Sequence, residues 1–175
     1  EYGLNPRPVI VNLSPEESLH RISQAIHSAK NIDEILIELK ESILMLFEAQ
    51  AITIYAVDGS KNEIFSKVKS GTETNEIRVP ISPVSIAGWV ASHEECVNIS
   101  NVYDEEELQS YNPDLKFDSS WDKKSGSVTK SVLGYPLLHA GKLMGVLQLV
   151  NKLNEVKFTA QDEKSATIIS ETLAL

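Results

Sequence analysis

The residues that could carry chemistry in this sequence do not form a catalytic or metal-binding pattern. Gly141-Lys142 resembles the end of a phosphate-binding loop, but neither Ser nor Thr follows Lys142, and the pair is more typical of a hairpin turn. His93 and Cys96 could share a face, yet the other histidines are scattered and a zinc site needs three or four ligands. The aspartates between residues 114 and 122 do not match a calcium loop. We therefore expect neither an enzyme nor a metal centre.

One set of side chains near the C-terminus does have a spacing with a physical meaning. In chain order, the set is Asn151, Lys152, Phe158, Asp162 and Glu163. Lys152 ends an apolar run, and Asp162 lies in the first turn of a predicted helix, where the helix dipole favours an anion. A Lys–Asp ion pair would fasten that strand to that helix, with Phe158 filling the joint. We expect these residues to hold the architecture together rather than to bind a ligand.

Capping residues and apolar periodicity predict the helices that position these groups. Ser14 can cap a first helix, Pro15 suits its first position, and apolar residues follow at spacings of three and four. A second amphipathic helix is expected over residues 32–47 and a short one over residues 86–92. The last helix should begin after Thr159 and reach the end of the chain.

A period of two predicts the strands. They are expected over residues 51–57, 63–69, 76–81, 96–99, 132–139 and 142–150. Residues 101–130 are polar and show little periodicity, which predicts a long loop, and a loop of this length is usually functional or disordered. The two hairpins imply an antiparallel sheet, and the helices at both ends of the chain can cover one of its faces. The fold class is therefore α+β.

Length and composition limit the class of protein. The chain has 175 residues, of which 42% are hydrophobic, a formal net charge of -9 and one cysteine. This length predicts one domain, which we place at residues 14–175, with residues 1–13 as a leader or linker. We expect the domain to belong to a longer multidomain protein. The negative charge disfavours nucleic acid and anionic membrane as partners, and no apolar run approaches the roughly 18 residues that span a bilayer. A single cysteine excludes an internal disulfide framework, so a cytoplasmic location is expected.

The order Asn-Lys, Phe, three residues, Asp-Glu over residues 151–163 resembles the signature of GAF domains in cyclic-nucleotide phosphodiesterases and some bacterial adenylyl cyclases. Further segments that resemble this family are residues 85–91, 97–103, 122–131 and 134–137. The resemblance covers about residues 15–175. It implies an antiparallel sheet of about six strands, with the terminal helices on one face and a pocket under loops and a short helix on the other.

The resemblance also implies where a ligand would bind. In cyclic-nucleotide-binding relatives the base lies over the sheet, the phosphate meets the N-terminus of the short helix, and a long loop folds over the ligand. Carried over to this sequence, the site residues are Thr53, Ile86, Ala87, Asp122, Ser125, Thr129 and Gln148. Backbone N–H groups of Ile86 and Ala87, behind the capping residue Ser85, would suit a phosphate. Gln148 interrupts an apolar run, and an inward-facing amide needs partners. The candidate ligands are cAMP and cGMP.

The sequence departs from the family at the end of the second strand. Nucleotide-binding relatives often carry an aromatic residue and an acid there, whereas this chain has Lys69-Ser70. Loss of a stacking ring would cost about 1–3 kcal/mol, by analogy with stacked bases in nucleic-acid complexes. Trp89 and Tyr103 are the aromatic residues that could compensate, although each also suits a core position.

Two functions therefore stay open. The first is a regulatory sensor that closes residues 101–130 over a small molecule, forms a homodimer through its terminal helices and signals to a fused effector. The alternative is a ligand-free GAF module kept mainly for dimerisation. Enzymatic and chromophore-bearing relatives fit less well, because they use several cysteines or a Cys followed by His, while Cys96 precedes Val97. Haem ligation through His93 or His139 is a further option.

Overall fold

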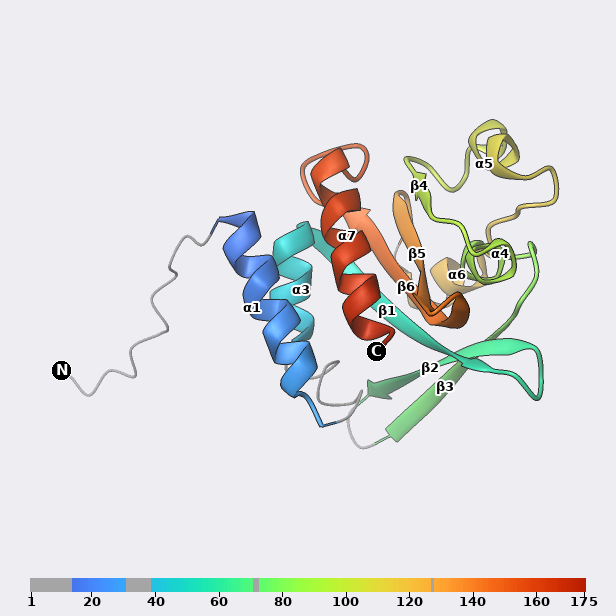
Figure 1. Ribbon diagram of the computed structural model, residues 1–175. Coiled ribbons are helices and arrows are strands. Elements are labelled where there is room, and N and C mark those ends of the chain that lie inside the picture. Colours follow the sequence, from blue (N-terminus) through green and yellow to red (C-terminus); the bar gives the residue numbers. More distant parts are fainter. Residues whose placement is uncertain (1–13, 31–38, 71–72, 127) are drawn as a thin grey trace.

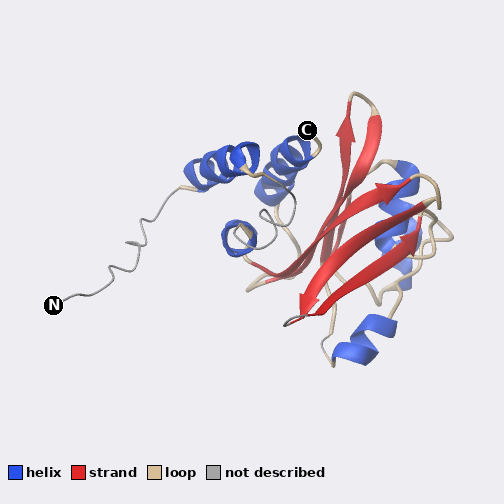
Figure 2. Ribbon diagram, turned by 90° about the horizontal axis from the view of Figure 1, so that it is seen from below, coloured by secondary structure: helices blue, strands red, loops and turns tan. Residues whose placement is uncertain are grey.

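A six-stranded antiparallel sheet organises the computed structural model, which describes residues 14–30, 39–70, 73–126 and 128–175 (Figures 1 and 2). The strands are β1 (Ala49–Asp58), β2 (Glu63–Ser70), β3 (Glu73–Pro80), β4 (Val97–Ile99), β5 (Val132–His139) and β6 (Lys142–Lys152). Their order in the sheet is β3-β2-β1-β6-β5-β4. The expected α+β class and antiparallel sheet are confirmed.

Three helices from the two ends of the chain pack on one face of the sheet: α1 (Pro15–Ser28), α3 (Lys40–Phe47) and α7 (Ala160–Leu173) (Figure 2). The predicted start of α1 is confirmed, because the Ser14 hydroxyl accepts a hydrogen bond from Glu17 N at 3.2 Å. The helix expected over residues 32–47 is described only in its last part, as α3, and residues 31–38 lie outside the described chain, as does the proposed leader at 1–13. Buried side chains of this face include Leu19, Ile22, Ile26, Ile43, Phe47, Ile54, Leu147, Leu149 and Ile169.

The opposite face of the sheet carries α4 (Ile86–His93), α5 (Glu105–Tyr111) and α6 (Ser120–Ser125) (Figure 2). Alternation along β1 decides which side chains reach it, since Ile54 packs with the terminal helices and its neighbour Tyr55 with α4. A second core fills this side. Its buried members include Tyr55, Ile64, Trp89, Val90, Val97, Ile99, Leu108, Leu115, Val132 and Val146.

Residues 101–130, here called the covering segment, are not the continuous loop that their polar sequence predicts. Helix α5 interrupts them, because Asp104 Oδ1 caps its first turn by accepting bonds from the N–H groups of Glu106 and Glu107, and Leu108 is buried beneath it. Helix α6 ends at Gly126, which adopts a φ of 72°. Both helices are short and carry few apolar residues, so neither produces a readable period.

The turn between β5 and β6 settles the role of Gly141-Lys142. Ala140 and Gly141 both have positive φ, at 52° and 77°, and His139 pairs with Lys142. Two successive left-handed residues are typical of a tight hairpin turn. The prediction of a hairpin rather than a phosphate loop is therefore confirmed.

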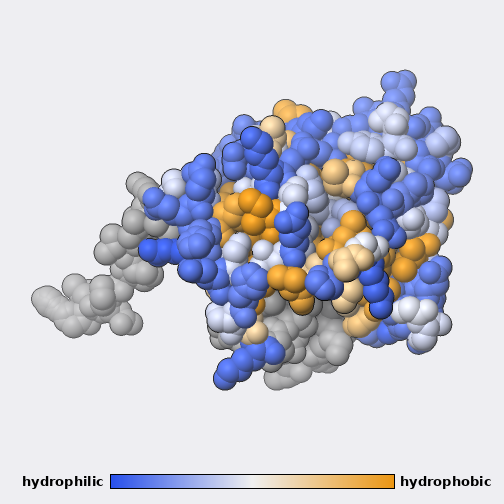
Figure 3. Space-filling model, in the orientation of Figure 1, coloured by the Kyte–Doolittle hydropathy of each residue, from blue (hydrophilic) through white to orange (hydrophobic). Residues whose placement is uncertain are grey.

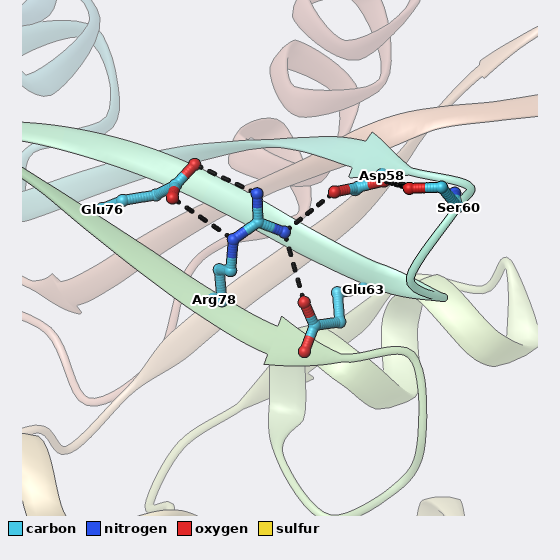
Figure 4. Close-up of polar contacts among 5 residues, drawn as sticks. All are labelled: Asp58, Ser60, Glu63, Glu76 and Arg78. Carbon is cyan, nitrogen blue, oxygen red and sulfur yellow. Dashed lines mark hydrogen bonds and ion pairs between the residues drawn. The ribbon is translucent and has the colours of Figure 1, made fainter.

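An arginine cluster ties together the far ends of β1, β2 and β3 (Figure 4). The Arg78 guanidinium contacts Asp58 at 2.9 Å, Glu63 at 3.2 Å and Glu76 at 3.2 Å, and it lies 5.1 Å from the Phe65 ring centre. Hydrogen bonds from Ser60 and from Arg78 lower the pKa of Asp58. The cluster fixes the strands that extend beyond the terminal helices, and it lies apart from the predicted site.

Candidate functional site

Polar side chains form a row across the sheet on the face that α4 covers. Thr53 of β1 pairs with Gln148 of β6, which pairs in turn with Gly134 of β5. A Cβ on Gly134 would lie 3.1 Å from a Val90 methyl group, so α4 passes directly over this row. Thr53 and Gln148 are both half-buried, and neither side chain has a hydrogen-bond partner within the described part of the chain. The structure thus brings two of the predicted site residues side by side with unused polar atoms.

The N-terminus of α4 has the geometry expected of an anion-binding turn. Ser85 Oγ accepts a hydrogen bond from Gly88 N at 3.0 Å, and Ser85 O accepts one from Trp89 N at 2.9 Å. Ile86 and Ala87 precede the first intrahelical donor, so the helix itself supplies no acceptor for their N–H groups. Both side chains are buried, and only their backbone can therefore meet a ligand.

Close backbone approach positions this turn. A Cβ on Gly88 would lie 2.5 Å from Pro80 O, and it would meet Ser82 O more closely still. No side chain fits there, so glycine allows α4 to begin immediately beside the end of β3. The strand end and the helix start are thereby held in one fixed arrangement.

Asp122 and Thr129, both predicted to contact a ligand, bind one another. Asp122 Oδ1 accepts from Thr129 Oγ1 at 2.7 Å, and Oδ2 accepts from Thr129 N at 2.9 Å and from the Tyr103 hydroxyl at 2.6 Å. Tyr103 also packs edge-on against Phe117, with ring centres 5.2 Å apart. These three residues form what we call the Asp122 latch, which joins the beginning of the covering segment to its end. Its geometry closes the segment on itself without any added molecule.

The latch also sets the charge state of its members. Burial raises the pKa of Asp122, but the hydrogen bonds from Tyr103 and Thr129 outweigh it, so the net pKa lies below the ordinary value. The bond to Asp122 raises the pKa of Tyr103. Asp122 is therefore a carboxylate, and Tyr103 a neutral hydroxyl donor, at neutral pH.

The remaining predicted contacts are less informative. Ser125 is the last residue of α6, and its side chain lies outside the described residues, as do those of Lys69-Ser70 at the end of β2. Trp89 is 2% exposed and stacks on His93 with ring centres 4.6 Å apart, so it belongs to the core and cannot stack on a ligand. Tyr103, a member of the Asp122 latch, is half-exposed and remains the candidate for stacking.

The Lys–Asp pair predicted from spacing is present. Lys152 Nζ lies 3.0 Å from Asp162 Oδ2 and donates to Phe47 O at 2.8 Å, and the two charged side chains are 5% and 8% exposed. Asp162 also completes a capping box with Thr159 at the start of α7. Phe158 is buried, with its ring centre 6.0 Å from Lys152 Nζ. The pair joins the end of β6 to the start of α7 and the end of α3.

Asn151 and Glu163, the outer members of the same set, hold other segments. Asn151 has a φ of 60°, its Oδ1 accepts from Lys130 N at 2.6 Å, and its Nδ2 donates to Val128 O at 2.9 Å. Glu163 Oε2 accepts from Asn98 Nδ2 at 2.9 Å. Neither role follows from sequence spacing, since the partners are 23 and 65 residues away in the Val128 and Asn98 contacts.

The described residues also bear on two other classes of site, a metal centre and a membrane span. In the part of the chain that the structure describes, no group of three or more His, Cys, Asp or Glu side chains is arranged to hold a metal ion. Among the same residues no helix is both long and apolar enough to cross a membrane. An open depression on α1, lined by Glu16, Glu17, His20 and Arg21, shares no residue with the predicted site.

Comparison with curated proteins identifies phosphodiesterases as relatives. Over 156 residues the chain is 32% identical to the probable 3',5'-cyclic phosphodiesterase pde-5 of Caenorhabditis elegans, covering 82% of this chain and 20% of that protein. It is 31% identical over 134 residues to the dual 3',5'-cyclic-AMP and -GMP phosphodiesterase 11 of Drosophila melanogaster, covering 70% of this chain and 8% of that protein. The chain thus spans a fifth or less of the length of these relatives.

Solved structures show the same fold. The GAF domain of a phosphoenolpyruvate-protein phosphotransferase from Acinetobacter superposes with a TM-score of 0.69 and 20% identity, covering 91% of this chain and 89% of that one. The free methionine-R-sulfoxide reductase of Neisseria meningitidis superposes with a TM-score of 0.66 and 18% identity, covering 91% and 87%. The GAF family model matches residues 31–175. With the sheet, the two helical layers and the relatives in agreement, the chain belongs to the GAF domain family.

Proposed function

We propose that this chain is a regulatory GAF domain that senses a cyclic nucleotide, cAMP or cGMP, on the α4 face of its sheet. The observation that carries the proposal is the unpaired Thr53–Gln148 row on the sheet face that α4 covers, together with the capped start of that helix. A half-buried amide without partners is costly unless a ligand or water satisfies it. The naming of the Drosophila melanogaster relative as a dual phosphodiesterase of cyclic AMP and GMP supports this class of ligand.

Different groups of the protein would contact the phosphate and the base of the nucleotide. The cyclic phosphate meets the N–H groups of Ile86 and Ala87, where the helix dipole and free donors favour an anion despite the chain's net charge of -9. The amide of Gln148 both donates and accepts, so it suits the edge of a base, and Thr53 adds a hydroxyl beside it. Asp122, Ser125 and Thr129 lie on the segment that closes over the ligand.

Signalling would follow from a shift between two states of the covering segment. A ligand shifts this equilibrium only as far as it binds the closed state better than the open one. We propose that the shift reaches the terminal helices, that these helices pair in a homodimer, and that a fused effector in a cytoplasmic signalling protein receives it. The domain itself would carry out no catalysis. The chain matches only 20% and 8% of the length of the two relatives. The rest of such proteins is long enough to include an effector domain.

A thermal-shift measurement with cAMP and cGMP tests the proposal. A ligand at 100 times its dissociation constant stabilises the folded state by about 2.7 kcal/mol, which corresponds to a shift of several degrees in Tm. Gln148→Leu should abolish the shift, whereas the matched control Gln24→Leu, an exposed position on α1, should retain it. Unchanged Tm with both nucleotides would reject the proposed ligand class.

One observation favours the alternative of a ligand-free dimerisation module. Asp122 and Thr129 already satisfy one another, so the covering segment has a closed state without ligand. In Figure 3, apolar patches lie among hydrophilic side chains on the face that includes the terminal helices. Sedimentation at several protein concentrations separates the two functions, because a structural module should dimerise equally with and without nucleotide.

A further inference from the structure

Asn98 stands between the covering segment and the C-terminal helix. It is the central residue of β4, a three-residue strand at the edge of the sheet, and its side chain is 7% exposed. An edge strand normally leaves one row of backbone groups without a strand partner. At Asn98 the Tyr111 side chain occupies this row, and the Asn98 side chain itself reaches the start of α7.

On one side, Tyr111 of α5 closes the edge. Its hydroxyl donates to Asn98 O at 3.1 Å and accepts from Asn98 N at 3.3 Å. One phenol thus replaces the neighbouring strand that β4 lacks. Since Tyr111 is the last residue of α5, the position of that helix is tied to the backbone of β4.

On the other side, the Asn98 amide holds the start of α7. Nδ2 donates to Phe158 O at 2.9 Å and to Glu163 Oε2 at 2.9 Å. Both partners are acceptors only, so the orientation of the amide is fixed by chemistry. Asn98 Oδ1 is buried and has no partner among the described residues, which means that the two donor bonds alone hold the side chain.

The other end of the covering segment is attached to the same region. Asn151 binds Lys130 N and Val128 O, and the next residue, Lys152, pairs with Asp162 in the first turn of α7. The covering segment is therefore connected to adjacent acidic side chains at the start of α7 by two routes, one from α5 through Asn98 and one from its C-terminal end through Asn151 and Lys152. Figure 1 shows α7 and α5 on different sides of β5 and β4, so no direct packing between the two helices provides this connection.

We propose that Asn98 is a coupling residue: through Tyr111 and Glu163 it makes displacement of α5 and loosening of the first turn of α7 a single cooperative event. The inference does not depend on which ligand the domain binds, because the connection exists in the chain alone. It assigns to Glu163 a role separate from the buried pair of Lys152 and Asp162. Coupling of this kind is reciprocal, so a change at either end must be felt at the other.

Amide hydrogen exchange of the chain without added ligand tests the coupling from the α5 side. Tyr111→Phe removes only the bridging hydroxyl, and loss of its two hydrogen bonds with Asn98 predicts about 5- to 100-fold faster exchange in α5 and in residues 164–169 of α7. Tyr103→Phe is the matched control, since it removes a hydroxyl from the same segment that bonds Asp122 instead. It should speed exchange around Asp122 and Thr129 and leave α5 and α7 unchanged.

The reverse experiment starts from α7. Glu163→Ala should speed exchange of α5, whereas Glu171→Ala, an exposed position on the same helix, should not. Strand β6 serves as the internal reference for global destabilisation. The proposal is overturned if Tyr111→Phe affects α7 no more than Tyr103→Phe does, if Glu163→Ala leaves α5 unchanged, or if β6 accelerates as much as the two helices.

Discussion

At the scale of single residues, the side chains that contribute most to stability are polar groups shielded from water together with their hydrogen-bonding or charged partners. Lys152 and Asp162 are nearly buried and 3.0 Å apart, and Asp122 accepts three hydrogen bonds. Buried polar groups cost little while they are paired and much more when one partner is removed. Substitutions at these positions should therefore have large effects that exposed substitutions lack.

Lys152→Met should lower the free energy of unfolding by about 3–5 kcal/mol, because it leaves the Asp162 carboxylate buried without its cation. Lys164→Met, on the exposed side of α7, is the control and should change stability little. In the double variant Lys152→Met, Asp162→Asn, the cost should be smaller than the sum of the single costs, since the unpaired charge is gone while Asn can still cap Thr159. Chemical denaturation of the control, of both single variants Lys152→Met and Asp162→Asn, and of the double variant measures these costs, and additive costs would contradict a direct pair.

Acid should weaken the Asp122 latch. The folded-state pKa of Asp122 lies below the unfolded value of about 3.9, so its contribution to stability is complete above that value and is lost as pH falls through the folded pKa. The Tm difference between wild type and Asp122→Asn should thus be constant near neutrality and shrink below about pH 4. A difference that stays constant or grows in acid would show that the latch does not form.

At the scale of elements, the sequence predicts those parts that repeat a period or carry a cap. Alternation found the strands, and Ser14 and Thr159 placed the starts of α1 and α7. Helices α5 and α6 were not predicted, because each has fewer than eight residues. Asp104, followed three residues later by Glu107, is nevertheless a capping signal that could have identified α5.

In the candidate site, too, some contacts could be predicted from the sequence and others could not. The Lys152–Asp162 pair followed from local spacing and a predicted helix start. The parts played by Tyr103 and Asn98 could not be predicted, because their partners lie 19 and 65 residues away and no periodicity links them. Only the tertiary fold brings these groups together, so they are visible in the structure alone.

Glycine at position 88 tests how α4 is placed. Gly88→Ala puts a Cβ against the carbonyl oxygens of Pro80 and Ser82, which are backbone atoms and cannot rotate away. Overpacking of this kind should destabilise the domain by about 1–3 kcal/mol. Gly59→Ala is the matched control, since nothing lies within 4 Å of its added Cβ. Equal Tm values for the two variants would contradict the close approach of α4 to the end of β3.

At the scale of the whole molecule, the sheet separates two helical layers, each with its own core. One face carries the terminal helices, and the other carries α4 and the covering segment over the Thr53–Gln148 row. The chain covers a fifth or less of the length of the phosphodiesterases to which it is similar. In the proposed function a signal passes from one face to the other, and the contacts of Asn98 and Asn151 connect the two faces.

Hydrogen exchange of the chain with and without saturating cGMP or cAMP tests this account most directly. With one of the two nucleotides, we expect slower exchange in the first turn of α4, in β1 and β6 around Thr53 and Gln148, and in the covering segment, together with a change at the start of α7. Gln148→Leu should remove all of these effects. Exchange that is the same with and without either nucleotide, or protection confined to another face, would contradict a cyclic-nucleotide sensor on the α4 side of the sheet.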